Sequence, residues 1–247
     1  MKIACVTGSV LLVFFFSSAS SVVAQMAADD SILYNRATQH FIDTYHRSSG
    51  DQLALYNGSQ YGNYPFSFTG GHAFFLDDKP GMGSVVYDGV LYPNVLLQYD
   101  EIQEALLFKD SLRLIQLLNQ RISKFTVFNS TFIRIVKDSA SPELVKTGYY
   151  NQLYAGNTSL LKKEIKIIRE DIAADKLVRY IDIHAYYYIK RNNQYVSFSG
   201  KRGLLRLFQE QKKDVQQFVR KNKLKFKDDS RDDSFAKMTA YYDQLTH

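Results

Sequence analysis

The chain has 247 residues and one cysteine, and its 31 Lys and Arg against 25 Asp and Glu give a net charge of +6. A chain of this length can bury a core large enough to fold without cross-links. A single cysteine excludes an internal disulfide framework and any metal site built from several cysteines.

Residues 1–24 predict a cleavable secretory signal. Lys2 supplies the positive charge, and residues 3–16 form an almost unbroken apolar run that is followed by serines. Ala24 and Val22 suit the last and third-last positions before a signal-peptidase cut. A membrane-spanning helix needs about 20 apolar residues, and this run ends sooner. We therefore expect a protein that is secreted, periplasmic or part of the cell envelope.

The only cysteine, Cys5, lies inside the predicted signal, so residues 25–247 would contain no thiol. It precedes the apolar run and therefore cannot become the lipid-modified first residue of a lipoprotein. No later stretch is long and apolar enough to cross a bilayer as a helix. We expect no transmembrane span once the signal is removed.

The first element predicted after the signal is an amphipathic helix over residues 29–47. Apolar side chains recur there at every fourth position, and Ser48, Ser49 and Gly50 end the pattern. Residues 52–80 are irregular and rich in Tyr, Phe, Gly and Asn, which favours a packed loop.

From residue 83 to residue 198 the apolar period changes to two, which predicts β-strands. Asp88 and Gly89 form the turn of a hairpin, because both tolerate the positive φ of a tight two-residue turn. Pro93 and Asn94 predict the next reversal. Further strands are expected at 95–99, 101–108, 112–118, 123–128, 131–136, 149–154, 160–168, 180–190 and 194–198. Segment 112–118 also fits a short helix.

The alternation is clearest in 180–190. One face would carry Ile181, Ile183, Ala185, Tyr187 and Ile189. The other would carry Tyr180, Asp182, His184, Tyr186 and Tyr188. Because strands and helices do not alternate along the chain, an antiparallel meander is favoured over a parallel sheet.

The helical period returns over residues 200–246. An apolar stripe through Leu204 and Val219 breaks near Gln209, and Asn222 can end the second helix. A last helix over about 230–245 would turn Phe235, Met238, Tyr242 and Leu245 inward. We therefore predict one α+β domain over residues 25–247. It would be an antiparallel meander, curved or closed into a half-barrel, with an N-terminal helix and two or three C-terminal helices.

Four runs of sequence carry a resemblance to a known family. They are residues 55–58 (Leu-Tyr-Asn-Gly), 71–75 (Gly-His-Ala-Phe-Phe), 83–92 and 218–226. Together they resemble an uncharacterised family of exported proteins from Gram-negative bacteria. The resemblance implies an envelope or extracellular location and carries no known activity, so it assigns no functional residue.

His72 is one of two histidines that could act as a base. It follows a pair of glycines in an aromatic loop, where a side chain or ligand can approach the backbone closely. A local packing role is the favoured interpretation, because such a residue more often satisfies nearby backbone groups and packs the loop.

His184 is the second histidine that could act as a base, because Asp182 lies on the same strand face two positions away and could orient its ring. No nucleophile stands at a recognisable spacing from this pair, which favours an ordinary polar sheet face.

Metal and cofactor sites are not predicted. His40 and His46 are six residues apart on the first helix, whereas helical metal ligands stand three or four apart. The acidic residues near the turns lack the alternating oxygen ligands of a calcium loop.

The strongest compositional signal is basic. Residues 201–227 contain ten Lys and Arg against Glu210 and Asp214, a net charge of +8 where the whole chain carries +6. A binding surface is predicted at Lys212, Lys213, Arg220, Lys221 and Lys223. Its partners would be anionic envelope components or another envelope protein. Nucleic acid is not expected, because export separates the protein from it.

Three functional hypotheses follow. The favoured one is a non-enzymatic binding or accessory protein of the cell envelope. A second is a carrier of an apolar small molecule or lipid, in a half-barrel pocket lined by Val85, Tyr87, Ile183 and Tyr187. A third is a hydrolase that uses His72.

Overall fold

The computed structural model describes residues 53–137, 145–192, 194–227 and 229–246. The predicted signal (1–24), its Cys5 and the predicted helix 29–47 lie outside the described residues, so these predictions stay predictions.

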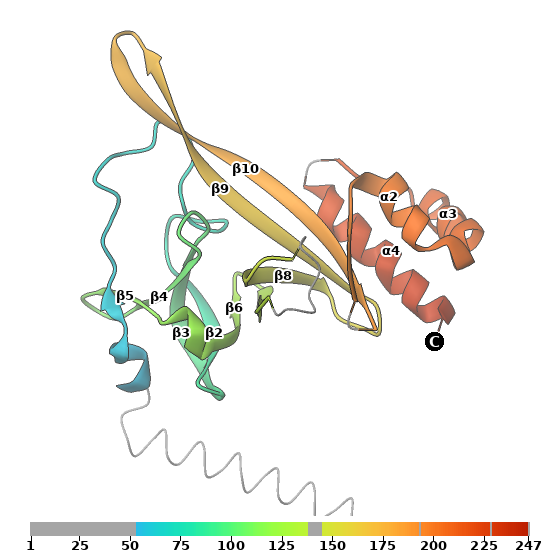
Figure 1. The fold of residues 1–247 in the computed structure, drawn as a ribbon, viewed down its shortest axis with the longest axis horizontal. Coiled ribbons are helices and arrows are strands. Elements are labelled where there is room, and N and C mark those ends of the chain that lie inside the picture. The colour runs from blue at the N-terminus through green and yellow to red at the C-terminus, as the bar shows by residue number, and fades with distance from the viewer. Residues whose placement is uncertain (1–52, 138–144, 193, 228, 247) are drawn as a thin grey trace, which may run out of the picture. The chain divides into compact units, whose positions relative to one another are not determined.

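The described residues form one open sheet of antiparallel strands, with α-helices after it (Figure 1). The strands are β1 (Ser59–Gln60), β2 (Gly81–Tyr87), β3 (Val90–Asp100), β4 (Ala105–Lys109), β5 (Leu114–Gln116), β6 (Ile122–Val127), β7 (Ser130–Ile135), β8 (Gly148–Tyr154), β9 (Ser159–Ala173), β10 (Lys176–Arg191) and β11 (Gln194–Phe198). The helices are α2 (Gly200–Leu207), α3 (Lys212–Lys221) and α4 (Ser230–Thr246), with short 3-10 turns η1 (Leu53–Asn57), η2 (Asn119–Arg121) and η3 (Gln209–Gln211). The predicted combination of antiparallel sheet and C-terminal helices is confirmed.

The strand order departs from a continuous meander. It runs β1-β5-β4-β3-β2-β6-β7-β8-β9-β10-β11, so the chain builds outward from β2 to β5 and then returns. β6 pairs with the free side of β2, where Val85 faces Phe125. The sheet therefore grows from β2 in both directions.

The hairpin at Asp88 and Gly89 is confirmed, since both have positive φ, 51° and 79°. The predicted reversal at Pro93 and Asn94 is wrong, because β3 continues through both residues. They oppose the single residue Ser84 between the pairs Gly83–Val95 and Val85–Tyr92. Asn94 has φ 54°, so its tolerance of left-handed backbone makes a β-bulge here instead of a turn.

The boundary predicted at residue 101 is also wrong. Residues 101–104 form a turn, and β4 begins only at Ala105. Asp100 holds that turn, because its Oδ1 accepts the backbone N–H groups of Ile102 and Gln103 at 2.8 and 3.0 Å. Segment 112–118 contains the three-residue strand β5, not a helix.

Two large clusters make the core. The first lies on β2 to β8 and is aromatic, with the rings of Phe125 and Phe132 stacked at 4.7 Å and Tyr99 against both. The second joins the end of β10 to the helices, where Phe208 stacks on Tyr242 at 4.0 Å. Each such buried ring contributes roughly 1.5–3 kcal/mol by leaving water, which explains why Tyr and Phe are abundant in a chain without disulfides.

The helical part agrees with the sequence at most positions. The break near Gln209 is confirmed as η3, and α3 ends at Asn222, whose side-chain amide donates to Phe218 O at 2.9 Å. On α4, Met238 is buried as predicted, together with Phe235 and Tyr242. Leu245 is 36% exposed, so its predicted inward position is wrong.

β9 and β10 form the longest hairpin of the sheet (Figure 1). Beyond Lys163, β9 pairs as a strand only with β10, since β8 covers only its first residues. Both faces of the hairpin are therefore partly open to solvent, and Ile172 is 75% exposed. On the predicted apolar face of β10, only the last two residues, Tyr187 and Ile189, are buried.

This exposure separates the four residues of the predicted carrier pocket. Val85 and Tyr87 are fully buried in the first cluster, Tyr187 belongs to the second, and Ile183 is 57% exposed. The four residues therefore do not line one common space.

Candidate functional site

His72 lies in a loop that runs beside the first residues of β10. The neighbouring Gly70 bridges to Tyr180. Gly71 has a φ of 80°, which favours glycine, and a Cβ there would lie only 3.2 Å from the Cβ of Ile181. The ring of His72 stacks near Phe74 at 6.5 Å, and its Nδ1 is buried without a hydrogen-bond partner among the described residues. No carboxylate or hydroxyl of the described chain orients this ring as a catalytic base requires.

The side chain of His184 is exposed on the β10 surface and has no hydrogen-bond partner among the described residues. Asp182 instead accepts from Arg169 Nε at 3.1 Å, across the β9–β10 pair. The structure therefore does not join Asp182 and His184 into a dyad, and the His72 ring has no hydrogen-bond partner among the described residues.

A line of buried and half-buried charges on β9 is the feature that the sequence did not reveal. Lys162, Glu164 and Lys166 share one face of the strand because they are two residues apart. Lys162 Nζ lies 2.7 Å from Glu164 Oε2 and 2.9 Å from Asp232 Oδ2, and Tyr187 donates to the same Asp232 at 2.6 Å. These contacts tie α4 to the sheet.

Glu101 ends this line and is almost fully buried, with a small cavity beside it. Lys166 Nζ lies 3.2 Å from its Oε2, outside hydrogen-bond geometry, and donates instead to the backbone oxygens of His72 and Phe74. Burial raises the pKa of Glu101 to about 7, helped by the nearby charge of Glu164 and opposed by Lys166. Lys166 thus supports the His72 loop, and Glu101 is a buried carboxyl at the end of the same line of charges.

The predicted basic surface lies on α3 and the residues after it. Lys212, Lys213, Arg220, Lys221 and Lys223 are all exposed. Within the described part of the chain, no Lys or Arg between residues 201 and 227 has a carboxylate within 4 Å, whereas the ion pairs of β9 and β10 are numerous. The basic charge of this segment is therefore not neutralised by its own fold.

Helix geometry gathers four of these residues on one side of α3. Lys212 and Arg220, and likewise Lys213 and Lys221, lie eight residues apart in two adjacent rows, with a glutamine between the members of each row. The buried residues Val215 and Val219 lie on the side of the helix that packs into the second cluster. The basic side is thus the solvent side of α3, a helix that itself packs beside α2 and α4 (Figure 1).

The apolar stripe of the same helices is already used. Leu204, Phe208, Val215 and Val219 are each no more than 2% exposed and pack with α4 in the second cluster. These helices therefore present charge to the outside and keep their apolar side chains inside.

The described residues offer neither a metal site nor a membrane-spanning helix. They contain no group of three or more His, Cys, Asp and Glu side chains arranged to hold a metal ion. None of the helices found in them combines the length and the apolar character needed to cross a membrane.

Comparisons with protein-family models, with curated proteins and with solved structures gave no match for this chain. The resemblance to exported proteins of Gram-negative bacteria therefore stays a prediction, and the functional argument depends on the site alone.

Proposed function

We propose that this protein is an exported, non-enzymatic accessory of the cell envelope that binds the anionic headgroups of a phospholipid surface. The observation that carries the proposal is the basic surface of Lys212, Lys213, Arg220, Lys221 and Lys223, exposed and without ion-pair partners in the described chain. Each basic side chain near an anionic membrane contributes about 1 kcal/mol of attraction. Five of them together suffice for peripheral binding.

The mode of binding follows from where the apolar residues lie. An amphipathic helix that inserts into a bilayer needs a free apolar face. On α3 that face is buried through Val215 and Val219. Binding would therefore be electrostatic, without insertion, and would weaken steeply as salt is raised.

The test is co-sedimentation of the purified protein with vesicles of phosphatidylcholine alone and with about a third of phosphatidylglycerol, which supplies the negative surface potential. We expect binding to the anionic vesicles only, reversed by salt. A variant with all five residues of the basic surface changed to Gln should lose at least about tenfold in affinity.

The matched control changes five other exposed basic residues to Gln, none of which forms an ion pair among the described residues: Lys79, Arg113, Lys124, Lys137 and Lys176. It alters the net charge equally and should keep most of the binding. Equal losses in both variants would reduce the effect to net charge and overturn the proposed surface. Binding to duplex DNA in place of vesicles would also overturn the proposal.

Export is tested separately. Expression in a Gram-negative host should release a product in the periplasm or medium whose first residue is Gln25, as found by N-terminal sequencing. An intact Met1 on the folded product in the cytoplasm would contradict this part of the proposal.

A further inference from the structure

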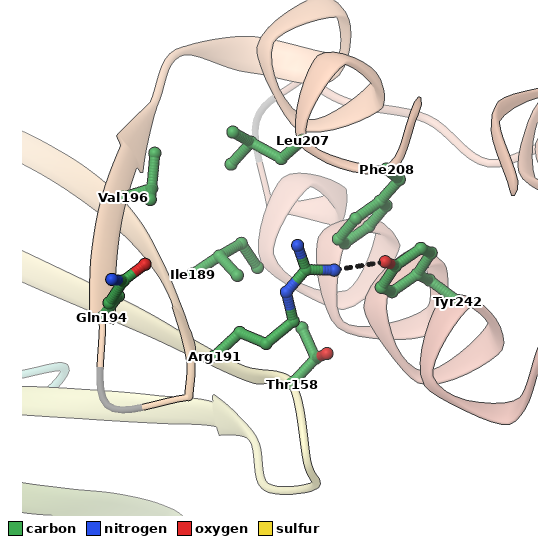
Figure 2. A pocket seen from close by; sticks show the side chains of 8 residues that line it. All are labelled: Thr158, Ile189, Arg191, Gln194, Val196, Leu207, Phe208 and Tyr242. Carbon is green, nitrogen blue, oxygen red and sulfur yellow. Dashed lines mark hydrogen bonds between the residues drawn. The ribbon is translucent and has the colours of Figure 1, made fainter. Parts of the chain in front are cut away.

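A cavity of about 80 Å³ lies between the ends of β10 and β11 and the helices α2 and α4 (Figure 2). Its lining consists of Thr158, Ile189, Arg191, Gln194, Val196, Leu207, Phe208 and Tyr242. None of these residues belongs to the basic surface, so the cavity is a separate feature of the molecule.

One wall of the cavity is apolar. Ile189 and Leu207 flank the Arg191 side chain, with Val196 on β11 opposite the helices (Figure 2). Phe208 and Tyr242 close the helical side with their stacked rings, 4.0 Å apart. This wall would accept a short hydrocarbon chain.

The polar side holds a buried donor with nothing to bind. Thr158 is fully buried, and its Oγ1 has no hydrogen-bond partner among the described residues. Its backbone is fixed, because its N–H donates to Asp243 Oδ1 at 2.8 Å and the preceding N–H donates to Oδ2 at 3.1 Å. A buried hydroxyl left unpaired costs about 1–3 kcal/mol, a cost that a ligand oxygen would remove.

Arg191 supplies the charge. Its Nη1 donates to the hydroxyl of Tyr242 at 2.5 Å, which directs the guanidinium toward the helices (Figure 2). No carboxylate of the described chain lies within 4 Å of it, and none of the described residues accepts from its Nε or Nη2. A guanidinium with two free donors is suited to a carboxylate, which it binds in a bidentate manner.

We infer that this cavity is a binding site for a short-chain monocarboxylate. The carboxylate would accept from Arg191 and the Thr158 hydroxyl, with the Gln194 amide at the rim, and the chain would lie along Ile189 and Leu207. A water occupies about 10–15 Å³ of such volume, so the cavity takes a molecule of roughly five to eight non-hydrogen atoms. Pentanoate, with seven, is a suitable probe.

Binding is tested by titration calorimetry of the purified protein with pentanoate, 1-pentanol and inorganic phosphate. For a ligand of this size we expect a Kd on the order of millimolar. Pentanol lacks the charge and phosphate lacks the chain, so both should bind at least about tenfold more weakly. Equal binding of pentanol would overturn recognition of the carboxylate, and equal binding of phosphate would overturn the role of the apolar wall.

Variants assign the effect to the named groups. Arg191→Gln should weaken pentanoate binding at least about tenfold and Thr158→Val about threefold or more, because each removes a donor without changing the shape of the wall. Arg206→Gln, on α2 outside the cavity, is the charge-matched control and should have no effect.

Thermal unfolding of each variant shows whether it is folded before titration. Folded Arg191→Gln that binds pentanoate as tightly as the parent would refute the site, as would a parent protein that shows no binding at about ten times the expected Kd.

Discussion

Glu101 makes the stability of the protein depend on pH in a direction opposite to that of an ordinary ion-paired carboxylate. Burial raises its pKa from 4.5 to about 7, although Lys166 lies 3.2 Å away. Between these two values the folded protein holds a proton that the unfolded chain has released. The contribution of Glu101 to the free energy of unfolding therefore falls as pH rises from 4.5 to 7.

The size of the effect follows from the pKa difference. A shift of one pKa unit corresponds to about 1.4 kcal/mol, so the full change across the window is about 3 kcal/mol. Glu101 is only 2% exposed, so solvent screening reduces this value little. For a domain whose total stability is about 5–15 kcal/mol, a change of that size is readily measured.

The measurement is urea unfolding at several pH values between 4.5 and 7 for the parent, Glu101→Gln and Glu210→Gln. Gln keeps the shape of Glu101 and cannot titrate, so the difference in stability between parent and Glu101→Gln should change by about 3 kcal/mol across the window. Glu210 is exposed on η3, so its substitution should leave the pH dependence of the parent intact.

A difference that does not vary with pH would show that Glu101 has an ordinary pKa in the folded protein. A difference of the opposite sign would show that attraction to Lys166 outweighs the burial of the carboxylate. Either result would refute the reasoning.

Two further predictions concern the sheet. Gly83→Ala should destabilise the fold by at least about 2 kcal/mol in urea unfolding, since the new Cβ would stand 1.9 Å from the backbone oxygen of Thr126. Gly62→Ala is its control and should be neutral, because a Cβ there meets nothing within 4 Å. Asp100→Asn should cost about 2–4 kcal/mol and change the near-ultraviolet circular dichroism of tyrosine, because Asp100 Oδ2 accepts from Tyr61 and Tyr64 at 2.6 and 2.9 Å. Asp77→Asn, at an exposed turn, is the control for Asp100, and an equal loss there would remove the special role of the buried carboxylate.

Local patterns in the sequence predicted the elements well where local chemistry decides them. The positive φ that Asp88 and Gly89 accept is a property of the two residues themselves, and the hairpin is found there. The break of the helical stripe at Gln209 and its end at Asn222 are likewise local. Asn94 shows the limit, because positive φ serves a bulge as well as a turn, and only pairing with β2 distinguishes them.

One of the two candidate sites could be predicted from the sequence, and the other could not. The basic residues of α3 could be identified from composition, and helix periodicity alone places them on one side. The cavity around Arg191 could not be found, because Thr158, Arg191 and Tyr242 come from segments up to 84 residues apart that meet only in the folded chain. Nothing in the spacing of these residues would indicate that they meet.

The sequence by itself determined most of the strands and helices and where the positive charge is concentrated, since these depend on neighbours along the chain. Only the tertiary structure decided that β6 returns to pair with β2 and that Glu101 is buried beside Lys166. It also left the Thr158 hydroxyl without a partner beside Arg191. Burial and pairing depend on contacts between distant segments, and the free energy of those contacts cannot be read from any one segment alone.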